Sequence, residues 1–346
     1  MLRTILILCA FAIGLGACQK TVPEYRATVY VFGTLIEIIL RDVEEDEAKK
    51  MVASLQEDFQ RLHKDWHAWK PGELSRLNAI FAQGGTQKVS DLLLPAIIKA
   101  KEFEEMSDGY FNPAIGNIIA AWGFHSDELP KGSMPPLDKI KDMAAAHPSM
   151  KDVVIEGHMV HSTNPMVSLD FGGFGKGLAL DMAEEKLKKM GVKHAVLNAG
   201  GDINTVGDHG DRPWVMAIRH PFVKWDVITS VELAPDEELY TSGNYERFRE
   251  HDGIQYSHII NPATGMPVNH IVSASVIDTN GALADAAATA LTVAGADDWH
   301  RIAKRMGLKY VLLIDEKGTF YANPAMKDRL KIPEGLNPTF VVSAPL

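Results

Sequence analysis

The alternation of apolar and polar residues along the chain marks out its secondary structure. Residues 27–40 are rich in β-branched and aromatic types with Gly33 in the middle, which predicts two strands or one bent strand. Residues 44–66 repeat apolar side chains at three- and four-residue spacing, which predicts an amphipathic helix packed on a core. A second helix is expected over 89–106, beginning at the cap-like Ser90.

Strand-like and helix-like stretches alternate over the rest of the chain. Between His125 and Pro136 the composition turns to proline, glycine and serine, which predicts a surface loop that either borders a functional site or has no role in one. The mixture as a whole predicts an α+β fold with mixed, largely antiparallel sheets flanked by helices. The expected strands cover residues 152–156, 194–198, 214–219, 227–233, 272–278 and 309–314, and the expected helices cover 175–190, 281–294 and 297–306.

The N-terminus has the pattern of a secretory signal. A charged Arg3 precedes an apolar stretch over residues 5–15, which is too short to span a membrane as a helix. The order Leu-Gly-Ala-Cys that ends at Cys18 resembles the bacterial lipobox, in which the cysteine is lipidated and becomes the first mature residue. We therefore expect a lipoprotein signal over 1–17, a tether over 18–25 and one domain over 26–346. An ordinary cleaved signal with an incidental cysteine is the alternative.

Composition narrows the classes of protein that the chain can belong to. Cys9 and Cys18 are its two cysteines, so the mature body has no disulfide framework. The formal net charge is −10 with 46% hydrophobic residues, which argues against a nucleic-acid surface. A packed enzyme or binding protein is the expected class.

A run of glycines between Asp170 and Lys176 opens directly into a helix-forming segment. Glycines let backbone N–H groups approach an anion, a helix N-terminus adds partial positive charge, and a lysine adds a full charge. The run matches neither the Rossmann fingerprint nor the Walker A loop, because Gly177 follows the lysine. A phosphate site and a tightly packed turn before a helix are both compatible with it.

Three further segments carry candidate chemistry. Asp285 and Thr289 lie four residues apart on an expected helix, so their hard oxygens share one face and suit Mg²⁺; an acid stabilised by the helix dipole is the alternative. His258 lies beside a turn, where it can act as a general base or as a hydrogen-bonded structural histidine. Residues 198–203 form a strand that ends in two glycines and an acid, which permits a close backbone approach.

In this order and spacing, the segments resemble the FAD:protein FMN transferases, also called the ApbE family. The resemblance covers nearly the whole mature chain: it begins at residues 32–34, continues through 68–78 and 108–116, and takes in the four segments above. It implies a two-lobed α+β fold with FAD in the cleft. It also implies an enzyme that binds FAD and Mg²⁺ and joins FMN to a threonine hydroxyl of a target protein, with AMP as the leaving group.

The resemblance also assigns roles to individual residues. It implies His258 as the base, and metal ligation by Asp285, Thr289 and the backbone carbonyl of Gly173. The residues that it implies in contact with FAD are Phe32, Trp69, Tyr110, Phe111, Asn112, Asp170, Lys176 and, through its backbone, Ile259.

The chain departs from the family pattern at several of these positions. Phe32 stands where methionine is usual, Asn112 where aspartate is usual, and Phe174-Gly175 where Ile-Ala is commoner. An aromatic ring at residue 32 can stack where a thioether only fills space, so flavin packing is expected to differ there. The change at residue 112 removes one negative charge.

Three other functions are alternative interpretations of the same residues. A Mg²⁺-dependent FAD pyrophosphatase would use the same residues with water as the acceptor. A lipid-anchored flavin-binding protein without turnover, or a solute-binding lipoprotein, would need neither a metal pair nor a base.

The resemblance implies where the protein works and with which partners. The implied partners are threonine-bearing acceptor proteins of membrane redox complexes, with the chain anchored in the bacterial cell envelope by its N-terminal lipid and facing the periplasm.

His63 and His67 are a further pair that the sequence brings forward. They lie four apart and are expected on the first helix, but they lack the glutamate of HExxH, so a solvated or packed helix face is expected there.

Overall fold

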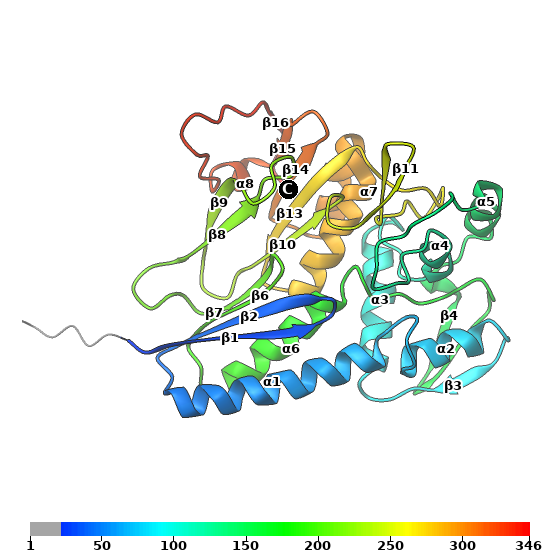
Figure 1. Ribbon diagram of the computed structural model, residues 1–346, viewed down its shortest axis with the longest axis horizontal. Coiled ribbons are helices and arrows are strands. Elements are labelled where there is room, and N and C mark those ends of the chain that lie inside the picture. Colours follow the sequence, from blue (N-terminus) through cyan, green and yellow to red (C-terminus); the bar gives the residue numbers. More distant parts are fainter. Residues whose placement is uncertain (1–21) are drawn as a thin grey trace, which may run out of the picture.

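The computed structural model describes residues 22–346, and the expected signal and Cys18 lie outside that range. A nine-stranded sheet dominates the described part, with strand order β1-β2-β6-β7-β10-β13-β14-β15-β16 (Figure 1). Its neighbouring strands pair antiparallel, except β15 and β16, which run parallel. The strands are β1 (Glu24–Val31), β2 (Thr34–Arg41), β6 (His194–Ala199), β7 (Asp202–Val206), β10 (Glu238–Gly243), β13 (Ile271–Asp278), β14 (Tyr310–Asp315), β15 (Phe320–Ala322) and β16 (Phe340–Val342).

The first two strands form a tight hairpin. Val31 pairs with Thr34, so Phe32 and Gly33 alone make the turn, with φ values of 54° and 73°. Two consecutive positive φ values are typical of a type I′ turn, whose twist matches that of the strands. The expected stretch of 27–40 is therefore two strands, and the first begins at Glu24.

Three long helices pack against the sheet and one another. They are α1 (Glu45–Asp65), α6 (Gly175–Lys189) and α7 (Gly281–Arg305). Helix α7 lies against β10 and β13 and also contacts α6, and α1 lies along β1. Gly295, with φ 69° and ψ −172°, kinks α7 at the point between the two helices expected from the sequence.

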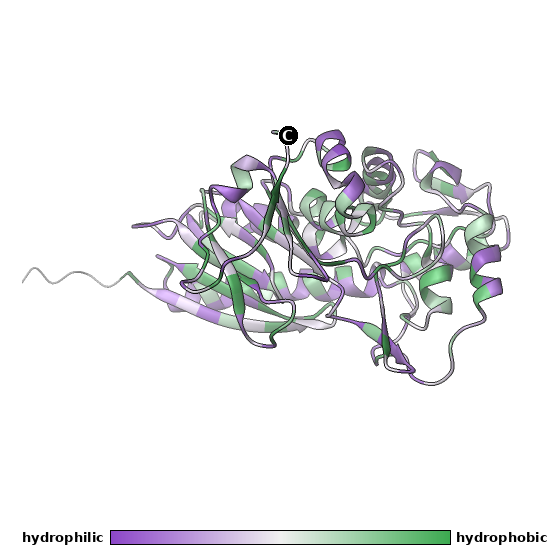
Figure 2. Ribbon diagram, turned by 90° about the horizontal axis from the view of Figure 1, so that it is seen from above, coloured by the Kyte–Doolittle hydropathy of each residue, from purple (hydrophilic) through white to green (hydrophobic). Residues whose placement is uncertain are grey.

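A smaller lobe completes the fold at the right of Figure 1. It combines the sheet β3-β5-β4 with short helices, and its own apolar cluster surrounds Trp122. In Figure 2, hydrophobic and hydrophilic residues alternate along these helices, as expected for elements with one buried face. The two-lobed α+β prediction is therefore confirmed. The elements are β3 (Thr86–Lys88), β4 (Val153–Glu156), β5 (Met159–Ser162), α2 (Glu73–Phe81), α3 (Leu94–Met106), α4 (Gly116–Ala121), α5 (Leu137–Ala145) and the 3₁₀ turn η1 (Met150–Asp152).

The remaining elements are short. Two hairpins, β8-β9 and β11-β12, stand outside the main sheet. Among residues 22–346, no helix combines the length and the apolar character needed to cross a membrane. The elements are β8 (Trp214–Arg219), β9 (Val227–Leu233), β11 (Phe248–His251), β12 (Ile254–Ser257) and α8 (Pro324–Lys327).

Two expected boundaries differ from the structure. Helix α3 begins at Leu94 and not at residue 89, because Ser90 Oγ accepts a hydrogen bond from the Leu93 N–H (3.2 Å) in a separate turn before the helix. Pro95, which has no N–H, then lies in the first turn of the helix, where that loss costs nothing. His67 lies beyond α1, which ends at Asp65.

Candidate functional site

The Gly-rich loop leads into α6 and is fixed from the opposite lobe. The Asn78 amide bonds both backbone groups of Leu169, accepting from its N–H (2.7 Å) and donating to its C=O (2.9 Å). The Gly175 N–H then donates to the Phe171 carbonyl (2.7 Å), which closes the turn. Both ends of the loop are thereby set, and the loop faces the start of α7.

Asp170 is joined to an aromatic pair by His125. His125 Nε2 lies 2.8 Å from Asp170 Oδ2, and its ring stacks on Trp69 with centroids 4.8 Å apart and planes at 20°. Burial alone would raise the pKa of Asp170, but the His125 contact and the Gly172 N–H lower it overall. Asp170 is therefore an anion. The sequence did not single out His125 itself, but His125 begins the loop over residues 125–136, for which an edge of the site was one of the two expectations.

The predicted metal ligands come together where α6 meets α7. Asp285, 5% exposed, accepts one hydrogen bond among the described residues, from the Gly177 N–H (3.0 Å). Thr289 Oγ1 lies 3.2 Å from Ser242 Oγ, and a Cβ added to Gly173 would lie 3.4 Å from the same Thr289 oxygen. Burial raises the pKa of Asp285, and the charge of Lys176 opposes that rise.

These ligand positions fit a hard divalent cation. The Asp285 carboxylate, the Thr289 hydroxyl and the Gly173 carbonyl are all oxygen donors, which Mg²⁺ prefers. Within residues 22–346, the buried Asp285 carboxylate accepts only one hydrogen bond. A bound cation would compensate for the hydrogen bonds that this buried carboxylate lacks.

Lys176 connects the Gly-rich loop to the turn between β6 and β7. Its ammonium group pairs with Asp202, which directly follows Gly200 and Gly201. The sequence named the 198–203 segment as a possible neighbour of the loop, and the structure brings the two together. An incoming phosphate must compete with Asp202 for this lysine.

His258 is held in a defined tautomer just after β12. Its Nδ1 lies 3.0 Å from the Arg247 carbonyl oxygen, and because a carbonyl only accepts, Nδ1 carries the proton. Burial lowers the pKa of His258 to about 4, so the ring is neutral near pH 7 and Nε2 has a free lone pair. Lys176 and Asp170 both act on this pKa, which places His258 within electrostatic reach of the loop.

Phe111, a predicted FAD contact, lies against Gly173 of the Gly-rich loop. A Cβ added to Gly173 would lie 2.9 Å from the Phe111 ring, and the ring packs edge-on against Phe174. At the hairpin turn, Phe32 packs edge-on against Phe59 (6.1 Å) and His63 (5.6 Å). Each ring thus has aromatic neighbours of its own, those of Phe111 at the Gly-rich loop and those of Phe32 on α1.

Three other predicted FAD contacts already have internal partners. The Tyr110 hydroxyl bonds Asp298, and the Asn112 amide donates to the Pro148 carbonyl (2.8 Å). The Ile259 N–H donates to Ser257 Oγ (3.1 Å), and its carbonyl accepts from the Val268 N–H (2.9 Å). The roles of these residues toward FAD stay predictions.

His63 and His67 form part of the aromatic surroundings of Trp69. Their rings lie 5.1 Å apart, and His67 is 4.2 Å from the Trp69 ring. His67 Nδ1 accepts the Lys70 N–H (3.1 Å), and burial lowers the pKa of His67 to about 4. This is the packed face expected from the sequence.

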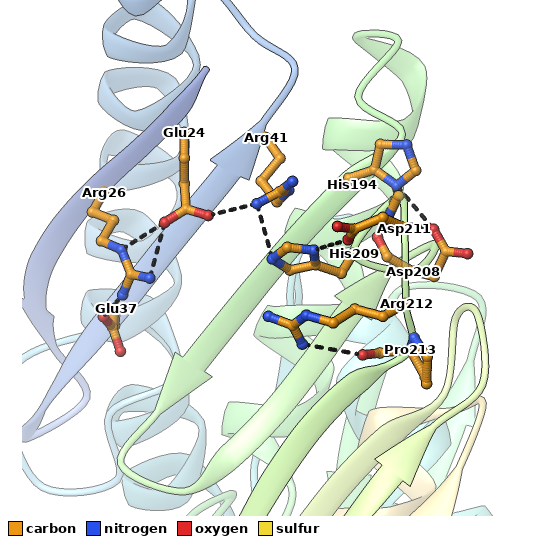
Figure 3. A network of polar contacts seen from close by, with 11 residues as sticks. Glu24, Arg26, Glu37, Arg41, His194, Asp208, His209, Asp211, Arg212 and Pro213 are labelled. Carbon is orange, nitrogen blue, oxygen red and sulfur yellow. Dashed lines mark hydrogen bonds and ion pairs between the residues drawn. The ribbon is translucent and has the colours of Figure 1, made fainter. Parts of the chain in front are cut away.

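A second polar network lies apart from these residues, beside the β1-β2 hairpin. Arg41 Nη1 contacts both Glu24 Oε2 (3.0 Å) and His209 Nε2 (2.9 Å), and His209 Nδ1 contacts Asp211 (Figure 3). A cavity of about 210 Å³ next to it is lined by Arg26, Trp214 and their neighbours. None of its lining residues is a predicted site residue.

Comparisons with known proteins agree with this geometry. A family model described as the ApbE family matches residues 32–312. The chain is 46% identical over 322 residues to a FAD:protein FMN transferase of Rhodobacter capsulatus, and the match covers 93% of this chain and 61% of that relative. It is 30% identical to a FAD:protein FMN transferase of Treponema pallidum, with 94% of each covered.

Solved structures show the same fold. The ApbE protein of Thermotoga maritima superposes with a TM-score of 0.80 at 26% identity, covering 89% of this chain and 99% of that one. The flavin transferase ApbE of Vibrio cholerae gives a TM-score of 0.77 at 25% identity over the same shares. In sequence and in fold, the chain belongs to the ApbE family.

Proposed function

We propose that this chain transfers FMN from FAD to a threonine hydroxyl of an acceptor protein, using Mg²⁺ and releasing AMP. One observation carries the proposal: the Gly-rich loop approaches Thr289 at Gly173, and Gly177, next to Lys176, donates its N–H to the buried Asp285 (3.0 Å), so an acid, a hydroxyl and a lysine meet where α6 crosses α7. The relatives named FAD:protein FMN transferase support the same reaction.

Residues of this chain can neutralise the negative charge that develops on the phosphates during the reaction. Phosphoryl transfer depends mainly on positioning and on neutralising negative charge. Asp285, Thr289 and the Gly173 carbonyl would hold the metal, which when bound withdraws charge from the FAD pyrophosphate. Lys176, at the first turn of α6, adds a positive charge beside the backbone N–H groups of the helix start.

The transfer itself exchanges one phosphoester bond for another. The threonine oxygen attacks the FMN phosphorus, the bond from that phosphorus to the bridging oxygen breaks, and AMP leaves with that oxygen. His258 Nε2, whose lone pair is free, accepts the threonine proton.

The acceptors are threonine-bearing proteins of membrane redox complexes, and the chain meets them from a lipid anchor at Cys18 on the periplasmic side of the bacterial envelope. The lipobox order supports the anchor. The first strand begins at Glu24, so the tether between the lipid and the folded body is short.

Product analysis tests the proposed reaction. The protein is incubated with FAD, Mg²⁺ and an acceptor domain, or with the same domain in which the target threonine is valine. Transfer predicts AMP without free FMN, and only with the threonine acceptor. Equal AMP and FMN with both acceptors would identify a pyrophosphatase, and unchanged FAD would identify a binding protein.

A further inference from the structure

Three carboxylates that the proposed reaction does not use converge behind the start of α7. Asp181 and Glu184 lie on α6, Glu238 begins β10, and one oxygen of each lies within 4.8 Å of the others. Glu184 and Glu238 are 7% and 2% exposed. Burying several carboxylates together is costly unless positive charge or hydrogen bonds compensate.

The neighbouring donors do not satisfy these oxygens. The Asn204 amide nitrogen lies 3.0 Å from Asp181, 2.8 Å from Glu184 and 2.8 Å from Glu238, but an amide has only two hydrogens for three acceptors. Among residues 22–346, Glu238 Oε2 is buried without any hydrogen-bond partner. The Asn204 amide is thus shared among three acids; Asp181 also accepts two backbone N–H groups, whereas one Glu238 oxygen has no donor.

The charge balance is also incomplete. Lys188 lies 2.7 Å from Glu184, but it is shared with Asp236 at 3.0 Å. The groups that act on the pKa of Glu238 are Asp181, Glu184 and Asp278, which all raise it together with burial. Fully ionised, the three acids carry a charge of −3 against one shared lysine.

Gly281, the first residue of α7, lies directly against the cluster. A Cβ at this position would lie 2.5 Å from Asp181 Oδ1, 2.6 Å from the Tyr240 hydroxyl and 2.7 Å from Glu238 Oε2. These distances are too short for a carbon–oxygen contact, so a side chain at residue 281 would displace the oxygens. The unpartnered Glu238 oxygen therefore lies close to the Tyr240 hydroxyl and to Asp181 at the start of α7.

We infer that Asp181, Glu184 and Glu238 bind a second divalent cation, of the hard class that prefers oxygen ligands, apart from the ligands Asp285 and Thr289. Oxygen donors alone select Mg²⁺, Ca²⁺ or Mn²⁺ over softer metals. The inference does not depend on the proposed reaction.

Such an ion would act by positioning α7. Asp181 accepts the Gly281 and Ala282 N–H groups, both at 2.9 Å, so it already holds the first turn of the helix. Asp285 follows one turn later. A cation that ties α6, β10 and this turn together fixes the place of Asp285 without touching the substrate.

Metal counting on the full-length protein tests the inference with Mn²⁺ alone, in the absence of FAD. The Asp285→Ala background removes the first site. We expect this variant to bind one Mn²⁺ per chain after dialysis and Asp285→Ala/Glu238→Gln to bind none. The control variant Asp285→Ala/Glu185→Gln, which loses an exposed acid of α6 outside the cluster, should keep the ion.

Two results would overturn the inference. If Asp285→Ala binds no Mn²⁺, the cluster is not a metal site and a proton held between Glu184 and Glu238 balances its charge instead. If Asp285→Ala/Glu238→Gln still binds one ion, the ion lies elsewhere. Circular dichroism checks folding, and Asp285→Ala/Glu184→Gln replaces the Glu238 variant if that variant unfolds.

Discussion

His125 links Trp69 to Asp170 in the candidate site. It bonds Asp170 at 2.8 Å and stacks on Trp69 at 4.8 Å. His125→Ala removes both contacts, so Asp170 and Trp69, two predicted FAD contacts, are no longer held in place. We expect FAD binding to weaken about tenfold, or about 1.4 kcal/mol. Fluorescence titration with FAD measures the change.

A surface histidine provides the matched control. His158 makes a bond of the same length, 2.8 Å, to Asp91, whose side chain is 97% exposed. His158→Ala should leave FAD affinity unchanged. Equal affinities for the two variants would show that His125 has no part in the site.

The protonation of His258 gives a prediction about pH and stability. Its pKa of about 4 in the folded protein lies below the ordinary 6.5, so the unfolded chain binds this proton first as the pH falls. Stability from neutral His258 is therefore full above pH 6.5 and is lost as the pH falls toward 4.

His258→Gln should reduce the loss of stability between pH 7 and 5 by about 1–2 kcal/mol, measured by urea unfolding at both values. His67, with a pKa also about 4, retains its own share of the loss. The interpretation is wrong if the two proteins lose equal stability.

At the scale of elements, the contact between α6 and α7 positions Asp285 in the candidate site. A Cβ on Gly177 would lie 2.3 Å from the Gly281 carbonyl oxygen, so Gly177→Ala must push the helices apart. We expect a loss of about 2–3 kcal/mol in unfolding free energy and weaker metal binding, because Asp285 bonds the Gly177 N–H.

Gly175→Ala is the control on the same helix. Its Cβ would lie 3.5 Å from the Phe171 Cβ, an ordinary contact, so the variant should unfold close to the wild-type urea concentration. Equal destabilisation by the two alanines would contradict the role given to the crossing.

Secondary structure could be predicted from the sequence where it depends on the spacing of nearby residues. The three- and four-residue apolar spacing of α1 and the four-residue spacing of Asp285 and Thr289 both carried through to the structure. The start of α3 was missed because a serine cap can close a separate turn before a helix. Periodicity does not distinguish these two uses of a cap.

At the scale of the whole molecule, the site combines parts that are distant along the chain. Lys176 meets Asp202, and His125 meets Asp170 across 45 positions. The resemblance named Asp285, Thr289 and Gly173 as proposed metal ligands, and Lys176 as a proposed FAD contact, from their motifs. It could not supply His125 or the three-acid cluster, because those depend on how the two lobes and the sheet pack.

Attachment to the membrane gives a prediction at the same scale. Cys18→Ser should move the protein from the membrane fraction to the soluble periplasmic fraction, because lipidation requires the thiol. Immunoblots of fractionated cells measure the distribution. A chain that stays with the membranes after this change is not held there by lipid at Cys18.

The central claim is that Asp285 at the α6-α7 crossing supports transfer of FMN to a protein. The most direct measurement is the intact mass of a threonine-bearing acceptor after incubation with FAD, Mg²⁺ and this protein. We predict a gain of one FMN residue with the wild type and with Asp297→Ala, which changes an exposed acid of α7. Asp285→Ala should give no gain. Full labelling by Asp285→Ala, or no labelling by the wild type, would contradict the account.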